Sequence, residues 1–268
     1  MIEVRDLVVR RSGRSILGPL DWTIRAGERW VVLGPNGSGK STLLSTVGLE
    51  LWPTAGTVEV LGARYGTIDS RDLRRRIGTA GSAVEASLRP DLTPTTLVMT
   101  ARHAATEPWW HVYSEDDRAR ARSLLEGLGL GAVADHPYET LSTGERRRTS
   151  IARALMPDPD LLLLDEPGAS LDLGAREHLI DDLTTLTSAE RPSAIVLVSH
   201  HVEEIPPGFS HALVLAGGLV VGAGPLTAVL SDGVLSRAYE MPIVVEWRDG
   251  RALARKGHAT RDRHTESR

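Results

Sequence analysis

"ERWVVLGPNGSGKSTLLSTVGLE", residues 28–50, links a short apolar run to a helical pattern through a loop rich in glycine. Residues 28–34 predict a buried strand, and residues 40–50 predict the helix that follows it. A strand, a tight loop and a helix in this order are typical of layered α/β proteins, in which helices cover a sheet. The stretch therefore predicts an α/β fold with this loop between a core strand and a helix.

The rest of the chain alternates short strand signals with helical ones. The stretch "GTVEVLG" (residues 56–62) alternates apolar and polar residues as a half-buried strand does, which fits an antiparallel edge region. Three later runs are almost continuously apolar, as strands covered on both faces are. They are "DLLLLDEP" (160–167), "SAIVLVSH" (193–200) and "HALVLAGG" (211–218). A helix is expected between the first two.

Residues 82–156 lack strand signals and predict an inserted helical subdomain. Helical patterns cover residues 93–105 and 114–130, and Ser114 with Asp117 forms a capping pair at the start of the second. Its apolar face consists of Leu124, Leu125 and Leu128. We expect one domain over residues 1–240 that carries this insertion.

Residues 241–268 are expected to form a C-terminal hairpin and a polar tail. The hairpin is predicted over residues 244–255, with its turn at Asp249-Gly250. The stretch from Lys256 onward is polar and is expected to be loose.

Composition excludes several classes of site. The chain has 268 residues, a formal net charge of −4 and no cysteine, so disulfides, thiol nucleophiles and cysteine metal sites are absent. Without a strong basic field, no direct contact with nucleic acid is expected. The first residues carry charges every few positions and lack the apolar core of a secretory signal, so a cytoplasmic location is expected.

A largely apolar stretch also fits a soluble domain. Residues 212–226 fall short of the roughly 20 residues that a membrane-spanning helix needs. Gly217-Gly218 interrupts the stretch, which predicts two strands joined by a turn.

The loop in the opening stretch matches a phosphate-binding pattern. "GPNGSGKST" fits G-x-x-x-x-G-K-[ST], and it lies between a predicted strand and a helix, as that motif requires. The candidate ligands are Gly34, Pro35, Asn36, Gly37, Ser38, Gly39, Lys40, Ser41 and Thr42. Lys40 is expected to reach the β- and γ-phosphates of a nucleotide, and the Ser41 hydroxyl to bind Mg²⁺. Of 31 basic residues only Lys40 and Lys256 are lysines, which favours a specific need for a compact charge at position 40.

Two carboxylates follow the apolar run at residues 161–164 directly. The end of a buried strand presents both at the rim of the sheet. We expect Asp165 to hold Mg²⁺, directly or through water, and Glu166 to act as the general base that activates an attacking water. The alternative, a cap for the next helix, is weakened by the phosphate loop upstream.

A second candidate anion site begins the helix predicted in "ETLSTGERRRTSIARAL", residues 139–155. Ser142 and Glu145 form an S-x-x-E capping box, and Gly144 leaves the backbone N–H groups unobstructed. Taken alone, the pattern also fits a helix that is merely well capped.

Beside the other two motifs, "LSTGE" resembles the LSGGQ signature of ATP-binding cassette (ABC) ATPases, and the resemblance covers the chain to about residue 240. It implies a P-loop NTPase core sheet with an antiparallel β edge region and an inserted helical subdomain. It also implies hydrolysis of MgATP in a head-to-tail homodimer, where Ser142, Gly144 and Glu145 of one copy complete the ATP site of the other. A separately encoded membrane permease is the implied partner, so the chain is expected at the inner face of the cell membrane.

The resemblance extends to two further motifs. "SLD" (residues 170–172) is similar to the D-loop that crosses the dimer interface, which assigns Asp172 to the nucleotide site. His200 follows a predicted strand and resembles the switch histidine that contacts the γ-phosphate and the catalytic water. His201 is expected to face solvent.

Two positions depart from the family pattern. The glutamine that touches Mg²⁺ is replaced by Ser82, and the chain contains no glutamine. We hypothesise that hydrolysis or its coupling is retuned there. The aromatic residue that stacks on adenine is replaced by Arg11, whose guanidinium plane can stack on a base, although a solvated arginine fits equally well.

The adjacent Trp109 and Trp110 lie in the predicted helical subdomain, which docks the membrane subunit in ABC transporters. They indicate either a partner contact or a local core between helices. The alternative function is a soluble ABC ATPase without a permease, with a role in assembly, molybdate-associated chemistry or repair. A protein that binds nucleotide without turnover is disfavoured by Glu166.

Overall fold

The strand at the centre of the molecule sends alternate side chains into two apolar layers. In the computed structural model, which describes residues 1–67, 70–188 and 192–257, this strand is β3 (Arg29–Leu33). Val31 and Leu33 join one buried cluster, whereas Trp30 and Val32 join the other. Because both faces of the strand are buried, its sequence is continuously apolar rather than alternating.

β3 lies inside a six-stranded sheet with the order β10-β9-β3-β8-β7-β6. The other strands are β6 (Ile77–Gly81), β7 (Leu161–Asp165), β8 (Ala194–Val198), β9 (His211–Ala216) and β10 (Leu219–Pro225). All neighbours are parallel except β9 and β10, which form the predicted pair of strands around Gly217-Gly218. The strands predicted from the apolar runs are confirmed.

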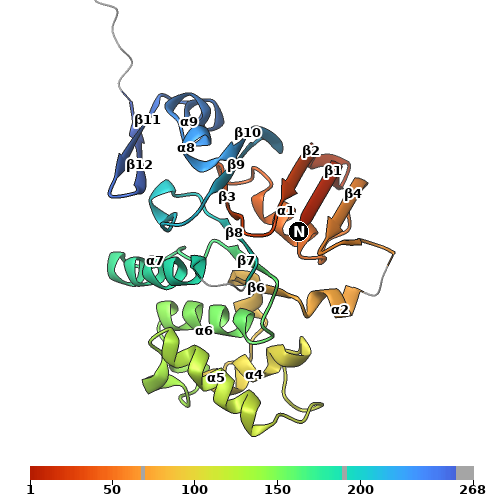
Figure 1. The fold of residues 1–268 in the computed structure, drawn as a ribbon, viewed down its shortest axis with the longest axis vertical. Coiled ribbons are helices and arrows are strands. Elements are labelled where there is room, and N and C mark those ends of the chain that lie inside the picture. The colour runs from red at the N-terminus through yellow and green to blue at the C-terminus, as the bar shows by residue number, and fades with distance from the viewer. Residues whose placement is uncertain (68–69, 189–191, 258–268) are drawn as a thin grey trace, which may run out of the picture.

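A second, antiparallel sheet covers one side of the molecule (Figure 1). Its order is β2-β1-β4-β5, formed by β1 (Ile2–Arg11), β2 (Arg14–Ile24), β4 (Ala55–Val60) and β5 (Ala63–Arg64). The strand predicted at residues 56–62 is β4. The edge region is thus a sheet of its own, and it shares an apolar cluster with α1 (Lys40–Val47).

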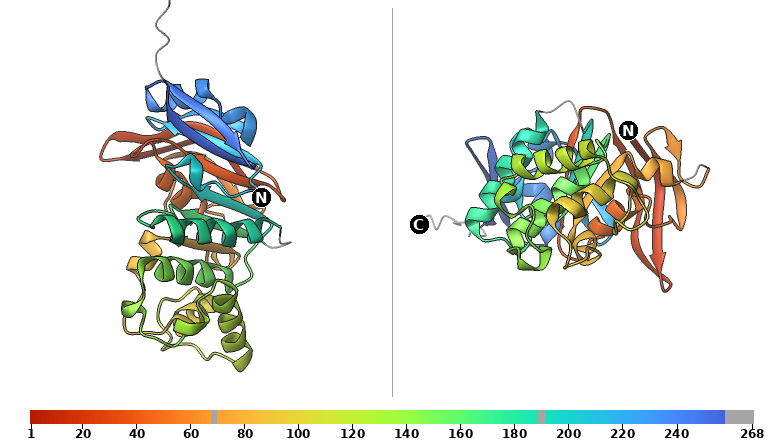
Figure 2. Two further views of the ribbon diagram at one scale, coloured as in Figure 1. Left: turned by 90° about the vertical axis from the view of Figure 1, so that its left-hand side faces the viewer. Right: turned by 90° about the horizontal axis from the view of Figure 1, so that it is seen from below.

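Short helices connect the strands between β4 and β7. They are α2 (Ser70–Arg74), α3 (Ser82–Ala86), α4 (Pro94–Thr100), α5 (Glu115–Gly127) and α6 (Thr143–Leu155). Figure 2 shows α4, α5 and α6 at the end of the molecule opposite the C-terminal hairpin. Among the residues that the structure describes, no helix combines the length and apolar character needed to cross a membrane.

Several predicted helices are shorter than the sequence pattern suggests. The helix predicted over residues 40–50 ends at Val47, because Gly48 caps it and Leu49 adopts a left-handed conformation with φ of 62°. The one predicted over residues 93–105 consists of α4 followed by a 3₁₀-helix at Ala101–His103. The predicted Ser114–Asp117 capping box is confirmed at the start of α5.

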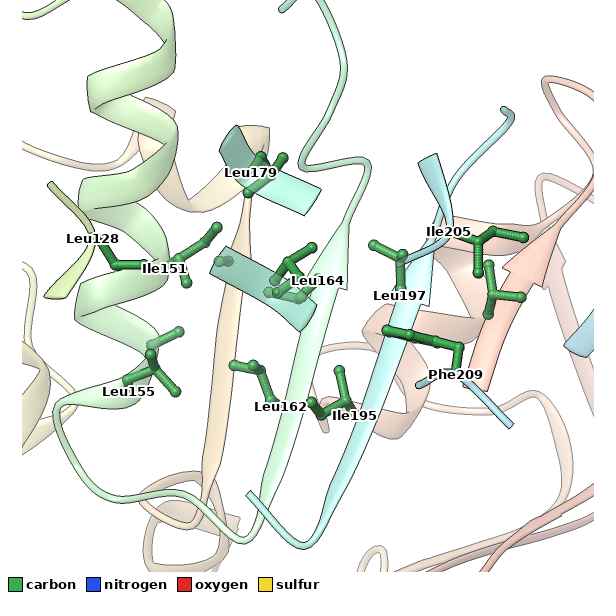
Figure 3. Packing of buried hydrophobic residues seen from close by; sticks show 14 of the residues in the cluster. Leu128, Ile151, Leu155, Leu162, Leu164, Leu179, Ile195, Leu197, Ile205 and Phe209 are labelled. Atoms are coloured by element: carbon green, nitrogen blue, oxygen red, sulfur yellow. The ribbon is translucent and has the colours of Figure 1, made fainter. Parts of the chain in front are cut away.

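The layer opposite α1 contains α6 and α7 (Leu173–Thr187), which pack on the central sheet. Figure 3 shows how side chains from both helices meet those of β7 and β8. The labelled residues include Ile151, Leu155, Leu162, Leu164, Leu179, Ile195 and Leu197, all of them buried. This layer holds the start of α6 in a fixed position relative to the carboxyl ends of the strands.

The last described elements are α8 (Leu226–Val229), α9 (Asp232–Tyr239), β11 (Ile243–Arg248) and β12 (Arg251–Lys256). The predicted hairpin around Asp249-Gly250 is confirmed as β11 and β12. Arg251 anchors it: one guanidinium nitrogen lies 2.5 Å from the Glu177 carboxylate, and the other donates to the Glu203 carbonyl at 2.7 Å. The tail was predicted to be loose from Lys256 onward, but Lys256 ends β12 and the Gly257 N–H donates to the carbonyl of Pro242; the rest of the tail, residues 258–268, lies outside the described residues. The boundary expected at residue 240 stays a prediction.

Helix α6 approaches the sheet closely at Gly78 of β6. A Cβ atom at this position would lie 2.3 Å from the carbonyl oxygen of Ala154 in α6, well inside the contact distance of the two atoms. The backbone of Gly78 has an ordinary conformation, so only this steric contact requires glycine. Gly78 therefore sets the spacing between α6 and the sheet.

Replacing Gly78 with alanine should lower the free energy of unfolding by about 1–3 kcal/mol, because the helix must move away from the strand. Gly127→Ala at the end of α5 is the matched control, since its Cβ would meet no atom within 4 Å. The control should leave stability unchanged or raise it by up to about 1 kcal/mol. Urea denaturation of both variants measures the difference, and equal stabilities would show that the close approach carries no constraint.

Candidate nucleotide site

The loop between β3 and α1 curls because its glycines adopt conformations that other residues avoid. Gly34 has φ of 147°, and a Cβ there would lie 2.0 Å from the carbonyl oxygen of Leu215 in β9. Gly37 has φ of 77°, and the space beside its Cα is open. The first glycine lets the loop pass close to β9, and the second leaves the concave side of the loop free for a ligand.

Lys40 lies under this loop and is buried, with 4% of its surface exposed. Its Nζ donates to the carbonyl oxygens of Gly34 at 2.9 Å and Pro35 at 3.1 Å. Burial lowers the pKa of Lys40, and the nearby carboxylates of Glu166 and Asp165 oppose that effect. The ammonium group is therefore held by carbonyl dipoles within reach of two acids.

Asp165 ends β7, and its carboxylate accepts a hydrogen bond from the Ser41 hydroxyl at 3.1 Å. Burial raises the pKa of Asp165, and the Ser41 hydrogen bond works against this shift. A hydroxyl and a carboxylate are both hard oxygen ligands, the kind that Mg²⁺ prefers. The donor set therefore fits a magnesium ion, and the predicted role of this pair stays a prediction.

Glu166 lies between the lysine and the histidine that the sequence singled out. Its carboxylate is 3.8 Å from Lys40 Nζ and 3.6 Å from His200 Nδ1. The Glu166 backbone has φ of 48°, a left-handed conformation that few residues other than glycine adopt, and its N–H donates to the carbonyl of Val198. Such strain is concentrated at functional sites, where the surrounding structure holds it.

His200 follows β8 and reaches this group from the neighbouring strand. Its Nδ1 atom is buried without a hydrogen-bond partner, which leaves it open to a ligand or to a short movement of Glu166. His201 is exposed, as predicted. The structure thus brings Lys40, Ser41, Asp165, Glu166 and His200 together.

A cavity of about 170 Å³ opens beside these groups. It is lined by the loop residues from Asn36 to Thr42 except Ser38, together with Ile16 and Glu166. Ile16 belongs to β2, and sequence reasoning missed it because nothing in "RSIL" distinguishes it from other edge-strand residues. Arg11 is exposed near the β1–β2 turn and does not line the cavity.

The second candidate anion site is built as the sequence predicted, but its groups are engaged with each other. At the start of α6 the Glu145 carboxylate accepts hydrogen bonds from both the N–H and the hydroxyl of Ser142, each at 2.8 Å. These bonds, above all the one from the Ser142 N–H, lower the pKa of Glu145. The Ser142 hydroxyl must therefore leave Glu145 before it can donate to a phosphate.

Ser142, Gly144, Glu145 and Asp172 do not line the cavity of their own chain. Asp172 caps α7, where its carboxylate accepts from the N–H of Ala175 at 2.8 Å. A Cβ at Gly144 would meet Ala175 at 3.4 Å, so the starts of α6 and α7 lie side by side. These residues form a second group, separate from the one around Lys40.

Ser82 is exposed at the end of β6, one residue beyond Gly81, which pairs with Asp165 of β7. Three residues later, Glu85 of α3 forms an ion pair with Arg147 of α6, with an N to O distance of 2.8 Å. Both side chains are largely buried, and burial raises the pKa of Glu85 while the charge of Arg147 opposes this. The sequence gave no sign of this pair, because its partners are far apart in the chain.

Comparison with known proteins agrees with this geometry. Residues 17–169 match the family model described as ABC transporter. The uncharacterized ABC transporter ATP-binding protein YlmA of Bacillus subtilis is 38% identical over 94% of this chain and 95% of its own length. A hemin import ATP-binding protein of Rhodococcus jostii is 34% identical over 89% of this chain and 80% of its own. A nickel import ATP-binding protein of Rhodobacter capsulatus is 33% identical over 90% of this chain and 95% of its own length.

Solved structures show the same fold. An ATP-binding cassette in a dimeric post-hydrolysis state, bound to ADP and Pi, superposes with a TM-score of 0.73 at 27% identity. The match covers 84% of this chain and 99% of that one. The relatives named here are transporter subunits, which gives the non-transport alternative no support. The family match and the extent of these similarities show that the chain belongs to the ABC transporter family, as an ATP-binding and ATP-hydrolysing subunit.

Proposed function

We propose that the group around Glu166 performs the hydrolysis of ATP in this subunit. The observation that carries the proposal is the position of one carboxylate within 4 Å of both a buried lysine and a histidine, beside a loop shaped for phosphates. In this arrangement the Glu166 carboxylate takes a proton from the attacking water, since it is the acid nearest to where a γ-phosphate would lie. His200 orients that water and the terminal phosphate.

Lys40 exchanges its carbonyl partners for phosphate oxygens when nucleotide enters the cavity. The exchange favours binding, because a charge-assisted contact to phosphate is stronger than one to a neutral carbonyl. Ser41 and Asp165 would hold Mg²⁺, which would supply positive charge to offset that of the phosphates. The loop from Gly34 to Thr42 donates its backbone N–H groups to the same oxygens.

The site is completed by a second copy of the chain in head-to-tail orientation. Two features support this: Ser142 and Asp172 are exposed, and neither lines the cavity of its own chain. A partner copy that presents them across the cavity would supply the N–H groups at the start of its α6 to the γ-phosphate. The known dimer of a similar cassette with ADP and Pi supports such an assembly.

Arg11 contacts the adenine base in this proposal. It is exposed near the β1–β2 turn, and Ile16 on the adjoining strand lines the nucleotide cavity. The base would then lie over Ile16, with the planar guanidinium stacked on it.

The subunit energises a separate membrane permease, which contacts the helical subdomain. Trp109, Trp110 and Val112, in the segment that precedes α5, are 57%, 85% and 93% exposed. Their exposure excludes the local core that was the alternative explanation of the two tryptophans. Large apolar side chains grouped on a surface mark a contact with another protein. The import proteins among the relatives support a permease as that partner.

Hydrolysis should rise faster than linearly with protein concentration, because two copies form each site. Glu166→Gln should lower the rate by about 10²–10⁴, since the amide cannot accept a proton, while ATP binding persists. Steady-state phosphate release over a range of concentrations tests both points. Glu115→Gln, which removes an exposed acid at the start of α5, is the control and should behave as wild type. A strictly linear dependence would contradict the dimer, and an active Glu166→Gln variant would contradict the assigned base.

Ser82→Gln should lower the Mg²⁺ concentration at which hydrolysis is half-maximal, because the longer amide reaches the ion that a serine contacts only through water. Titration of the ATPase rate with Mg²⁺ measures this. Ser87→Gln, at the exposed end of the same helix, is the matched control and should leave the titration unchanged. If both variants titrate like wild type with an unchanged rate, position 82 has no part in metal binding.

Loss of the exposed tryptophans should detach the subunit from membranes. The wild-type chain is expected to sediment with membranes prepared from its own source cells, and the double variant Trp109→Ser with Trp110→Ser to remain in the supernatant. Trp52→Ser removes a tryptophan that is 62% exposed in the segment between α1 and β4, and this variant should still sediment. Membranes stripped of protein by protease should bind neither the wild-type chain nor the Trp52→Ser variant. Equal sedimentation of the double variant and the wild type would place the permease contact elsewhere.

A further inference from the structure

A second cavity, of about 180 Å³, lies between the loop that carries His200 and the C-terminal elements. His200, His201 and Glu203 line it from that loop. Tyr239 lines it from the end of α9, and Lys256 from the end of β12. The same histidine therefore borders both this cavity and the carboxylate of Glu166. No part of the hydrolysis site described above uses this space.

The walls of the cavity are held in place on both sides. Arg251 ties β12 to the Glu203 carbonyl and to the Glu177 side chain in α7. The Tyr239 hydroxyl lies 3.4 Å from the carbonyl oxygen of His200, to which it donates. Burial, and then the charge of Glu203, raises the pKa of Tyr239, so the hydroxyl keeps the proton that it donates. The cavity is a built feature, since hydrogen bonds fix both the loop and the hairpin.

Apolar side chains form much of the lining, with two opposite charges among them. Val202, Leu235 and Ile243 supply apolar surface. Within the described part of the chain, neither Glu203 nor Lys256 forms an ion pair, although both border the cavity. Arg255 is engaged by Glu246 at 2.7 Å. The half-buried Glu203, which lies near the charge of Arg251, and the exposed Lys256 thus border the same space without forming an ion pair with each other.

We propose that this cavity binds a small zwitterion, an α-amino acid with an apolar side chain, in contact with His200. Its carboxylate pairs with Lys256, its ammonium group pairs with Glu203, and its side chain packs against the apolar wall. A ligand with only one charge would leave one of the two protein charges unpaired. Size is compatible, because a cavity of about 150 Å³ already admits benzene. Lys256 is also one of the two lysines in a chain that otherwise uses arginine.

Binding to the full chain is tested without ATP, with L-leucine as the probe and three matched analogues. 4-Methylpentanoate lacks the amino group, 3-methylbutylamine lacks the carboxylate and glycine lacks the side chain. Saturation-transfer NMR and calorimetric titration should give leucine the highest affinity, with each analogue about tenfold weaker or more. The acid and the amine each lose one charged contact, and glycine loses the burial of the apolar side chain. Absence of leucine binding, or equal affinity for all four probes, would overturn the proposal.

Two charge variants separate the contacts from any general effect on the fold. Lys256→Met should weaken leucine and 4-methylpentanoate by about tenfold and leave 3-methylbutylamine unchanged. Glu203→Gln should do the reverse, weakening leucine and the amine but not the acid. Arg248→Met, on the same hairpin but outside the lining, should change none of them. Equal losses for every probe in either variant would refute the assigned contacts.

The contact between the ligand and His200 is tested separately, by NMR. Leucine should shift the imidazole Cε1–Hε1 resonance of His200, assigned by its disappearance in His200→Asn, and an unshifted resonance would place the ligand elsewhere. Leucine should also change the ATPase rate, and this consequence alone rests on the proposed function. Because binding and the NMR shift are measured without ATP, an inactive enzyme cannot be mistaken for an empty site. An active enzyme whose rate ignores bound leucine would refute the regulatory consequence.

Discussion

The nucleotide site depends on the parallel register of four neighbouring strands. Val32 of β3 pairs with Val198 of β8, Val198 pairs with Asp165 of β7, and Asp165 pairs with Gly81 of β6. Because parallel strands end at the same edge, the residues that follow these positions are brought together. They are the phosphate loop, Glu166, His200 and Ser82. A shift of one strand by one residue would exchange its buried faces, so the two apolar layers also protect the alignment of the site.

That alignment leaves strain and buried charge concentrated at one edge. Glu166 is held in a left-handed conformation by the hydrogen bond from its N–H to Val198. Lys40 is buried beside it. Its ammonium group donates to two carbonyl oxygens and lies near two carboxylates. Both arrangements are costly on their own, and the buried ammonium group of Lys40 becomes favourable once an anion occupies the loop. The loop and the groups around it are thus arranged to favour a phosphate.

Whether a feature of the fold or of the site could be predicted depended on how far apart in the sequence its residues lie. The phosphate loop, the acids after β7 and the capping box at Ser142 are local patterns, whose residues follow one another closely. Their local structure could therefore be predicted. Ile16 could not, because it reaches the cavity from β2 through pairing with β1, and no local pattern records that approach. The helix ends also escaped prediction, since Leu49 stops α1 with a backbone conformation that its side chain does not announce.

The cavity beside His200 was equally hidden, because its lining comes from three separate segments that meet only in the fold. The C-terminal hairpin itself was visible from its alternation and its Asp249-Gly250 turn. What the sequence could not give was the surface on which it packs. Arg251 fixes the hairpin on that surface, because it bonds to α7 and to the loop after β8. A lone arginine in a hairpin predicts no particular partner.

The ion pair between Glu85 and Arg147 connects the two groups of candidate residues. Glu85 lies three residues beyond Ser82 on α3, and Arg147 lies three residues beyond Gly144 on α6. Removal of one partner from such a buried pair leaves an uncompensated charge, which costs about 3–5 kcal/mol. The pair therefore favours the present spacing between these parts of α3 and α6. If the proposed roles hold, this pair links the edge of the sheet that holds the metal to the start of α6, which contacts the partner's ATP. This link does not depend on what Ser82 itself contributes to the metal.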